Sequence, residues 1–200
     1  MAVPVAPITA AALTGLIVGE IPAPAGTSLI YVKTRGSYRR PISYELRNIA
    51  GEPVGTITPL DGRNRRVSVV RVGEQPELLL TVDRAGNTSV ARPDGTPLGK
   101  FRRRFAVFSF RMKVRGDDRT VGTLIYRGFT SASVAVPGGA VAARIRRGRG
   151  MRFSKASVSK MHLTGTGIPP LSGALLVAAV PALDAMHKAW RQSRFNAGGS

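Results

Sequence analysis

The sequence predicts a mainly β (α+β) protein in which a closed antiparallel β-barrel encloses one apolar C-terminal α-helix. Short segments with alternating apolar and polar residues follow one another from about residue 28, and a glycine-containing hairpin unit recurs along them. One apolar run near the C-terminus has helical length. An apolar helix in a chain of strands needs apolar walls on every side, and the interior of a closed barrel supplies them.

The first 27 residues are interpreted as a flexible N-terminal arm. Segment 1–20 has no charged side chain before Glu20, Pro4 and Pro7 interrupt it, and it lacks the basic start of a signal peptide. A signal or membrane-anchor segment is the alternative. We expect the barrel domain to cover residues 28–190 and a disordered tail to cover 191–200.

Several segments after residue 28 have the length and pattern of strands. Segment 42–47 alternates, and segments 66–72 and 77–82 are β-branched or apolar runs. The clearest alternation is in segment 108–115, where phenylalanine, methionine and valine fall on one face and serine and basic residues on the other. Alternation with a period of two predicts half-buried antiparallel strands.

A short unit recurs in segments 51–57, 95–101 and 118–124. Each has a turn, an aliphatic residue and a glycine followed by a strand, and the glycines are Gly55, Gly99 and Gly122. Glycine permits a β-bulge, a positive φ or a close backbone approach. We therefore expect a meander of hairpins that re-enter the sheet at these positions.

The apolar C-terminal run predicts one helix over about residues 172–188, with Ser172 as its N-cap. Pro181 lies inside this helix and is expected to kink or loosen it. Residues 161–183 have no Asp, Glu, Lys or Arg, but glycines and prolines occupy the first part of that stretch. A core helix is favoured over a membrane span, which needs about 20 apolar residues. It places the side chains of Leu175, Leu176, Val180 and Leu183 inside the strands.

The repeated hairpin unit and the final "ALLVAAVPALDAM" helix together resemble the tubby C-terminal-like superfamily, in its scramblase and LURP-one-related branch. The resemblance covers roughly residues 28–190. It implies a barrel of about twelve strands threaded by an apolar C-terminal helix, with roles in anionic-lipid or phosphoinositide binding and in calcium-triggered lipid scrambling. The residues that carry it are Gly51, Gly55, Gly95, Gly99, Gly122, Ala174, Leu175, Leu176, Ala178, Ala179, Leu183 and Asp184.

The chain departs from that branch in two places. The scramblases carry an acidic, calcium-binding loop before the terminal helix, whereas segment 152–170 here has no carboxylate. Calcium needs several oxygen ligands, usually with Asp or Glu among them. The chain also has no cysteine, so the palmitoylated cysteine cluster of some scramblases is excluded.

Positive charge is concentrated in the second half of the chain. Residues 1–100 contain 12 basic and 8 acidic residues, and residues 101–200 contain 18 and 3. Such a field attracts nucleic acid or an anionic lipid surface. Because 24 of the 30 cations are arginine, a coding bias without any anionic ligand is the alternative.

Two basic clusters, in segments 100–104 and 144–155, are the strongest functional signal. Both faces of the second run are basic, so we expect an edge strand, a loop or an exposed ribbon there. Arginine forks match phosphate geometry. The predicted phosphate or head-group contacts are Lys100, Arg102, Arg103, Arg104, Arg144, Arg146, Arg147, Arg149 and Arg152.

Catalytic and cofactor motifs find little support. The only two histidines, His162 and His187, have no cysteine partner, and a contact between His187 and Asp184 is expected to satisfy polar groups at the helix end. Segment 157–160 matches S-x-x-K but lacks the companion motifs of penicillin-recognising enzymes. We expect no enzyme activity, no cofactor and no metal.

The sequence therefore predicts a non-enzymatic module that binds anionic phospholipid head groups. We expect a cytoplasmic location with peripheral attachment to a membrane. Non-specific nucleic-acid binding and a structural barrel with no anionic ligand are the alternatives. The oligomeric state stays open.

Overall fold

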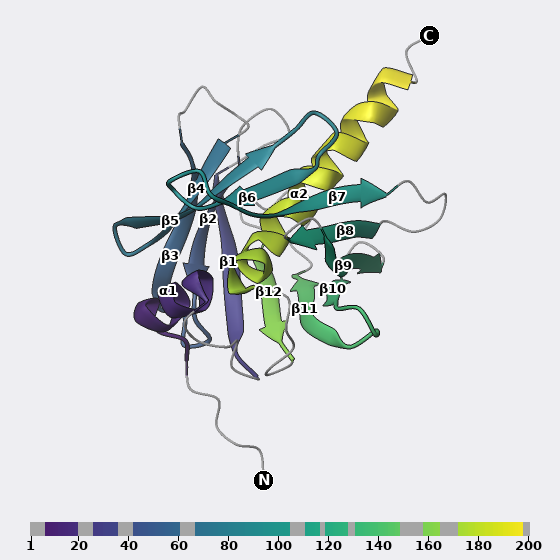
Figure 1. Cartoon of the computed structure of the whole chain (residues 1–200). Coiled ribbons are helices and arrows are strands. Elements are labelled where there is room, and N and C mark those ends of the chain that lie inside the picture. The colour runs from purple at the N-terminus through teal and green to yellow at the C-terminus, as the bar shows by residue number, and fades with distance from the viewer. Residues whose placement is uncertain are drawn as a thin grey trace.

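The computed structural model contains a closed barrel of twelve antiparallel strands (Figure 1). Each strand pairs with the next one along the chain, and β1 pairs with β12 to close the ring. The structure describes residues 7–19, 26–35, 42–60, 67–104, 111–116, 119–127, 131–148, 158–164 and 172–197. The strands are β1 (Ser28–Arg35), β2 (Ser43–Arg47), β3 (Pro53–Pro59), β4 (Val67–Val72), β5 (Gln75–Val82), β6 (Thr88–Ala91), β7 (Pro97–Arg104), β8 (Arg111–Gly116), β9 (Arg119–Arg127), β10 (Ser131–Ala135), β11 (Val141–Arg147) and β12 (Val158–Leu163).

The predicted alternation is confirmed in the strands that the structure describes. In β8, Met112 and Val114 are fully buried, and the three basic residues that alternate with them lie on the outer face. Phe108 and Phe110, which belong to the same predicted pattern, lie outside the described residues. In β2, Tyr44 and Leu46 point into the barrel, as the alternation of segment 42–47 predicts.

Helix α2 (Gly173–Ala197) runs through the barrel and continues beyond the strands at one end (Figure 1). The core-helix prediction is confirmed, because Leu175, Leu176, Val180 and Leu183 are at most 3% exposed. The backbone N–H of Leu176 donates to the Ser172 carbonyl at 3.1 Å, so the predicted start is correct. The predicted end is wrong, because the helix continues through residues expected to form a disordered tail.

Pro181 leaves helix α2 intact because β1 supplies the missing donor. Proline has no N–H, so the carbonyl four residues earlier, that of Val177, loses its helical partner. The hydroxyl of Tyr31 donates to this carbonyl at 3.0 Å. Tyr31 is fully buried, and this burial raises the pKa of its phenol far above the usual value. The hydroxyl therefore keeps its proton and remains a donor.

The recurrent glycine unit marks β-bulges in three hairpins. In the β2–β3, β6–β7 and β8–β9 pairs, the register shifts by one residue. The residue without a register partner is the aliphatic one that precedes each glycine, namely Val54, Leu98 and Val121. A Cβ added to Gly99 would lie 2.4 Å from the Arg115 carbonyl oxygen, and Gly99 has a φ of +154°. The bulge prediction is thus confirmed, and close backbone approach is why the position needs glycine.

The N-terminal segment differs from the expected flexible arm, since it contains helix α1 (Ala10–Val18). The Thr9 hydroxyl accepts a hydrogen bond from the Ala12 N–H at 3.2 Å, and Leu13 is fully buried. The helix packs against the start of α2, where a Cβ on Gly173 would lie 2.1 Å from the Leu16 carbonyl oxygen. Helix α1 therefore covers the end of the barrel at which α2 begins (Figure 1).

Candidate functional site

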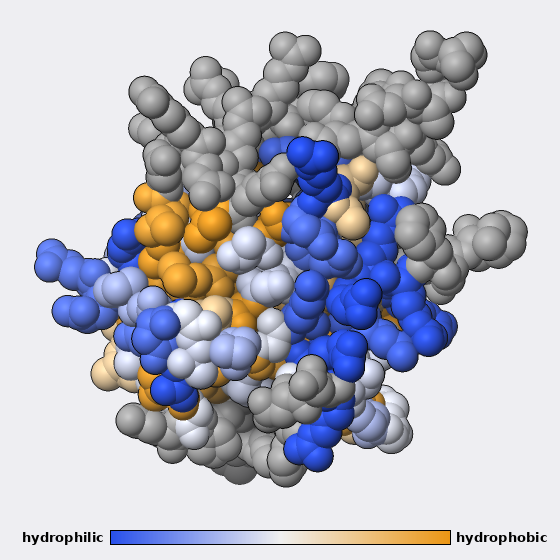
Figure 2. Space-filling model, turned by 45° about the horizontal axis from the view of Figure 1, so that its top comes forward, coloured by the Kyte–Doolittle hydropathy of each residue, from blue (hydrophilic) through white to orange (hydrophobic). Residues whose placement is uncertain are grey.

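Basic residues are concentrated in one half of the barrel wall. Strands β1–β6 contain four basic and two acidic residues. Strands β7–β12 contain no acidic residue and thirteen basic ones: four in β7, three in β8, two in β9, three in β11 and one in β12. Since β7–β12 are adjacent in the ring, the first predicted cluster and the described part of the second, Arg144–Arg147, belong to one half of the barrel. Figure 2 shows strongly hydrophilic side chains gathered over one side of the molecule.

The outer faces of β7 and β8 form the densest part of this half. Residue register places Lys100 opposite Arg115, Arg102 opposite Lys113, and Arg104 opposite Arg111. We call these six residues the cation ladder. Like charges directly opposite one another on a sheet face destabilise it, so the ladder costs folding free energy, which an anion bound between its cations would offset.

Two hollows lie along the cation ladder. One, of about 460 Å³, is lined by Arg102, Arg103, Arg104, Lys113, Arg115 and Thr120. The other, of about 560 Å³, lies beside it toward β6 and shares Arg102 and Arg115 with the first. Each arginine presents several N–H donors in a planar fork that fits a phosphate. The ladder is therefore a concave surface with donors on several sides.

One end of the cation ladder lies near an acidic residue. Burial by itself raises the pKa of Asp83, but hydrogen bonds from Asn87 and the charge of Lys100 outweigh it and leave the pKa below its usual value. The Asn87 side chain donates to Asp83 at 2.7 Å and its oxygen accepts from the Arg103 N–H at 2.8 Å. Lys100 is thus partly compensated by a neighbouring carboxylate.

A second group of cations lies on the outer faces of β11 and β12. Arg144 and Arg146 are exposed, and register places them opposite His162 and Lys160. The Nδ1 atom of His162 is 3.1 Å from the Ser28 hydroxyl oxygen. On the other side of β11, the register partners are serines of β10. This group is smaller than the cation ladder and is mixed with neutral donors.

Arg147 does not belong to either outer group. It follows the buried Ile145 on the inner face of β11 and forms an ion pair with Asp184 of α2, with its side chain 19% exposed. Its other terminal nitrogen lies 3.0 Å from His187 Nδ1. The expected edge strand, loop or exposed ribbon is therefore wrong for β11, which pairs on both sides. The inner face accepts a cation because the helix provides a carboxylate.

The Asp184 carboxylate also binds a tyrosine of β2. The hydroxyl of Tyr44 donates to Asp184 Oδ2 at 2.5 Å. Burial, followed by the negative charge of Asp184, raises the pKa of Tyr44 well above its usual value, so the phenol stays protonated. His187 contacts the Tyr126 ring edge-on, with 4.5 Å between ring centroids. Arg147 contacts both His187 and Asp184 and so links the two residues for which the sequence predicts a contact.

The remaining predicted residues fall into three groups. Lys100, Arg102 and Arg104 are exposed, as a binding role requires. Arg103 is half-buried and shares the inner side of β7 with the fully buried Phe101. Arg149 and Arg152 lie outside the described residues.

Sequence reasoning missed three members of the cation ladder and one residue of β12. Arg111, Lys113 and Arg115 were recognised as one strand face but were not assigned to the site. Lys160 was isolated in the sequence and becomes part of a group only through pairing with β11. The signal for the β8 residues was their alternation with buried residues, and only the register shows that they face the cations of β7.

The comparisons with known proteins concern the fold. No protein-family model matches the chain, and no curated protein matches it. The X-ray structure of protein AT5G01750 from Arabidopsis thaliana is similar, with a TM-score of 0.60 and 15% sequence identity, over 86% of this chain and 98% of that one. At this identity the likeness shows the fold alone, which in this chain is a twelve-stranded closed antiparallel barrel around a helix. None of the described helices has the length and apolar character needed to cross a membrane.

Proposed function

We propose that this protein is a non-enzymatic binding module for anionic phospholipid head groups at a membrane surface, and that it belongs with the tubby-like barrels of the scramblase and LURP-one-related branch. The observation that carries the proposal is the cation ladder, in which six cations face one another on two adjacent strands without an acidic residue in either strand. The twelve-stranded barrel around an apolar C-terminal helix supports the suggested relationship.

The chemistry of the ladder suits phosphate esters. Guanidinium groups bind phosphate oxygens in a bidentate manner, and the two hollows give such a group contacts from more than one side. Each basic residue close to an anionic membrane contributes about 1 kcal/mol. Six such residues are therefore enough for reversible attachment.

Co-sedimentation with liposomes tests the proposal. The wild-type protein should pellet with vesicles that contain phosphatidylserine or phosphoinositides and stay in solution with phosphatidylcholine vesicles, at one moderate salt concentration. The binding should persist in a calcium chelator, because segment 152–170 offers no carboxylate. Equal binding to neutral and anionic vesicles contradicts the proposal.

A matched pair of variants locates the binding surface. The double variant Arg102→Gln/Arg104→Gln removes two charges from the ladder and should weaken binding to anionic vesicles about 30-fold, which corresponds to about 2 kcal/mol. The control Arg84→Gln/Arg92→Gln removes two exposed arginines from turns and should retain most of the binding. Equal losses in the two variants would assign the binding to net charge alone.

Nucleic-acid binding is the second candidate, because the same cations would bind any phosphate chain without sequence preference. Gel-shift measurements with mixed-sequence DNA and RNA, at the salt concentration of the liposome assay, separate the two candidates. Rank order at matched salt is the informative quantity, since both interactions weaken steeply with ionic strength. Tighter binding to nucleic acid than to anionic vesicles favours this candidate.

A further inference from the structure

The outer face of strands β7–β12 contains one continuous row of register partners. Each member lies opposite the next on the neighbouring strand, from β7 to β12. In this order the row is Arg104, Arg111, Ile125, Ser133, Arg144 and His162. The cations therefore occupy the two flanks of the row, and its middle, on β9 and β10, is uncharged.

The neighbouring rows add further cations to each flank. Toward β7, Arg102 and Lys113 are followed by Thr123 on β9. Toward β12, Lys160 and Arg146 pair with each other, and Arg146 faces a serine of β10. Between the flanks lie three uncharged outward positions, Thr123, Ile125 and Ser133, which we call the neutral strip; in the next row the register partner of Ser131 on β9 is Arg127, so the strip ends there.

The curvature of the barrel determines what this pattern can contact. Neighbouring strands lie about 4.8 Å apart, so the row of six residues spans an arc of about 24 Å. Six of twelve strands cover half of the ring, so the neutral strip is the most protruding line of this half. The flanking cations lie further back on both sides, and their long side chains can extend toward the same plane.

We propose that the barrel lies on its side on an anionic bilayer, with the neutral strip nearest the membrane and the cations of β7–β8 and β11–β12 binding head groups on either side of it. This inference rests on the function proposed above and adds the orientation and the second contact. The partly exposed Ile125 then faces the head-group region, and the two flanks resist rotation about the barrel axis.

The composition of the strip favours a lipid surface over a nucleic-acid strand. Proteins that bind single strands without sequence preference stack bases on aromatic side chains. The outward residues of β9 and β10 in the described structure are aliphatic, hydroxyl-bearing or basic, and Tyr126 of β9 points inward and is 8% exposed. An anionic bilayer presents a flat array of phosphates above a less polar interior. A neutral strip between two groups of cations fits such a surface.

The absence of cysteine makes the orientation directly measurable. Single variants Thr123→Cys and Ser133→Cys place a fluorophore on the neutral strip, and Thr81→Cys places it on the exposed outer face of β5 in the other half. Lipid-attached nitroxides in anionic vesicles should quench the first two labels strongly and the third weakly. Circular dichroism should show the same fold in all three variants.

Each outcome decides a different point. Strong quenching at residues 123 and 133 with weak quenching at residue 81 supports the proposed orientation. Vesicle binding with equal or stronger quenching at residue 81 overturns the orientation and leaves the proposed function standing. Absence of vesicle binding, or a label response to RNA in its place, overturns both.

Discussion

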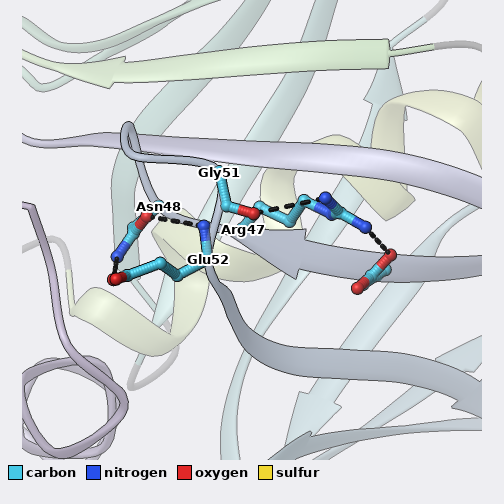
Figure 3. Close-up of polar contacts among 5 residues, drawn as sticks. Arg47, Asn48, Gly51 and Glu52 are labelled. Carbon is cyan, nitrogen blue, oxygen red and sulfur yellow. Dashed lines mark hydrogen bonds and ion pairs between the residues drawn. The ribbon is translucent and has the colours of Figure 1, made fainter.

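Strands β1–β6 and strands β7–β12 form two halves of one barrel, and their charged residues are arranged by opposite rules. In β2 and the turn that follows it, the charged side chains have local partners. Arg47 binds Glu45 at 2.9 Å and the Gly51 carbonyl at 3.2 Å, and Asn48 binds Glu52 at 2.7 Å in the adjoining turn (Figure 3). In β7–β12, cations face cations across neighbouring strands.

The difference argues against composition as the source of the basic surface. A coding bias toward arginine acts on the whole sequence and would place basic residues on both halves. The observed division, four basic residues with two acidic ones against thirteen with none, follows the order of strands in the ring. The inner faces of both halves are mainly apolar, so the contrast concerns the outer surface, with Arg103 and Arg147 as the inward basic residues of the second half.

The largest loss of stability is expected from a charge placed in the barrel interior, which both halves share. Leu176→Asp introduces a carboxylate at a position that is 3% exposed and surrounded by strands. Burial of an unpaired charge should destabilise the fold by about 4 kcal/mol or more, so the variant should lose the cooperative unfolding transition in circular dichroism. Thr81→Asp on the outer face of β5 is the control and should unfold like the wild type. A folded Leu176→Asp protein would contradict the enclosed position of α2.

Next in size are changes at glycines where two backbones meet. Gly99→Ala should lower the free energy of unfolding by about 3 kcal/mol, because the new methyl group meets the Arg115 carbonyl and the positive φ is unfavourable. Gly51→Ala has an unfavourable φ of +87° but nothing within 4 Å of the added Cβ. It should cost only about 1 kcal/mol. Urea denaturation measures both, and equal losses would show that the close approach at Gly99 is unimportant.

The ion pairs of the two halves should differ in how much they contribute to the free energy of unfolding. Asp184→Asn leaves Arg147 half-enclosed without its carboxylate and should cost about 3 kcal/mol. Glu45→Gln removes the partner of Arg47, whose side chain is 41% exposed, and should cost about 0.5 kcal/mol or less. Thermal or urea unfolding of the two variants gives the comparison. If the order is reversed, the inner pair does not hold α2 in the barrel.

The smallest effect is expected from the cation ladder itself. Arg102→Gln/Arg104→Gln relieves repulsion between opposed cations and should raise the free energy of unfolding by about 0.5 kcal/mol at low salt. The gain should vanish at high salt, where screening already weakens the repulsion. The control Arg84→Gln/Arg92→Gln should show little dependence on salt. A variant less stable than the wild type at every salt concentration would mean that the ladder stabilises the fold.

Local patterns in the sequence predicted most of the barrel, because strand alternation, glycine bulges and the apolar C-terminal helix each depend on residues that are close together in the sequence. They did not predict α1. Its residues are mostly Ala, Thr and Leu without the polar face of an ordinary surface helix, since it packs against α2 and the barrel end. Thr9 and Gly19, which cap it, were the available signals.

The candidate site was predictable only in part, for the same reason. Alternation in β8 identifies an outward basic face, but the pairing of Lys113 with Arg102 depends on strand register. Arg147 had the appearance of a surface cation because its partner, Asp184, is 37 residues away in sequence. Contacts that depend on how distant segments align are not encoded in any local pattern.

The position of α2 also determines when this chain can fold. The helix at the centre of the barrel follows all twelve strands in the chain and is synthesised after them, and the ring itself closes only when β12 meets β1, between residues as far apart as Ser28 and His162. A nascent chain that still lacks α2 has twelve strands with an apolar inner face and nothing to fill it. Completion of the fold must therefore follow synthesis of α2, and until then the strands already made present an unfilled apolar face that is prone to aggregation.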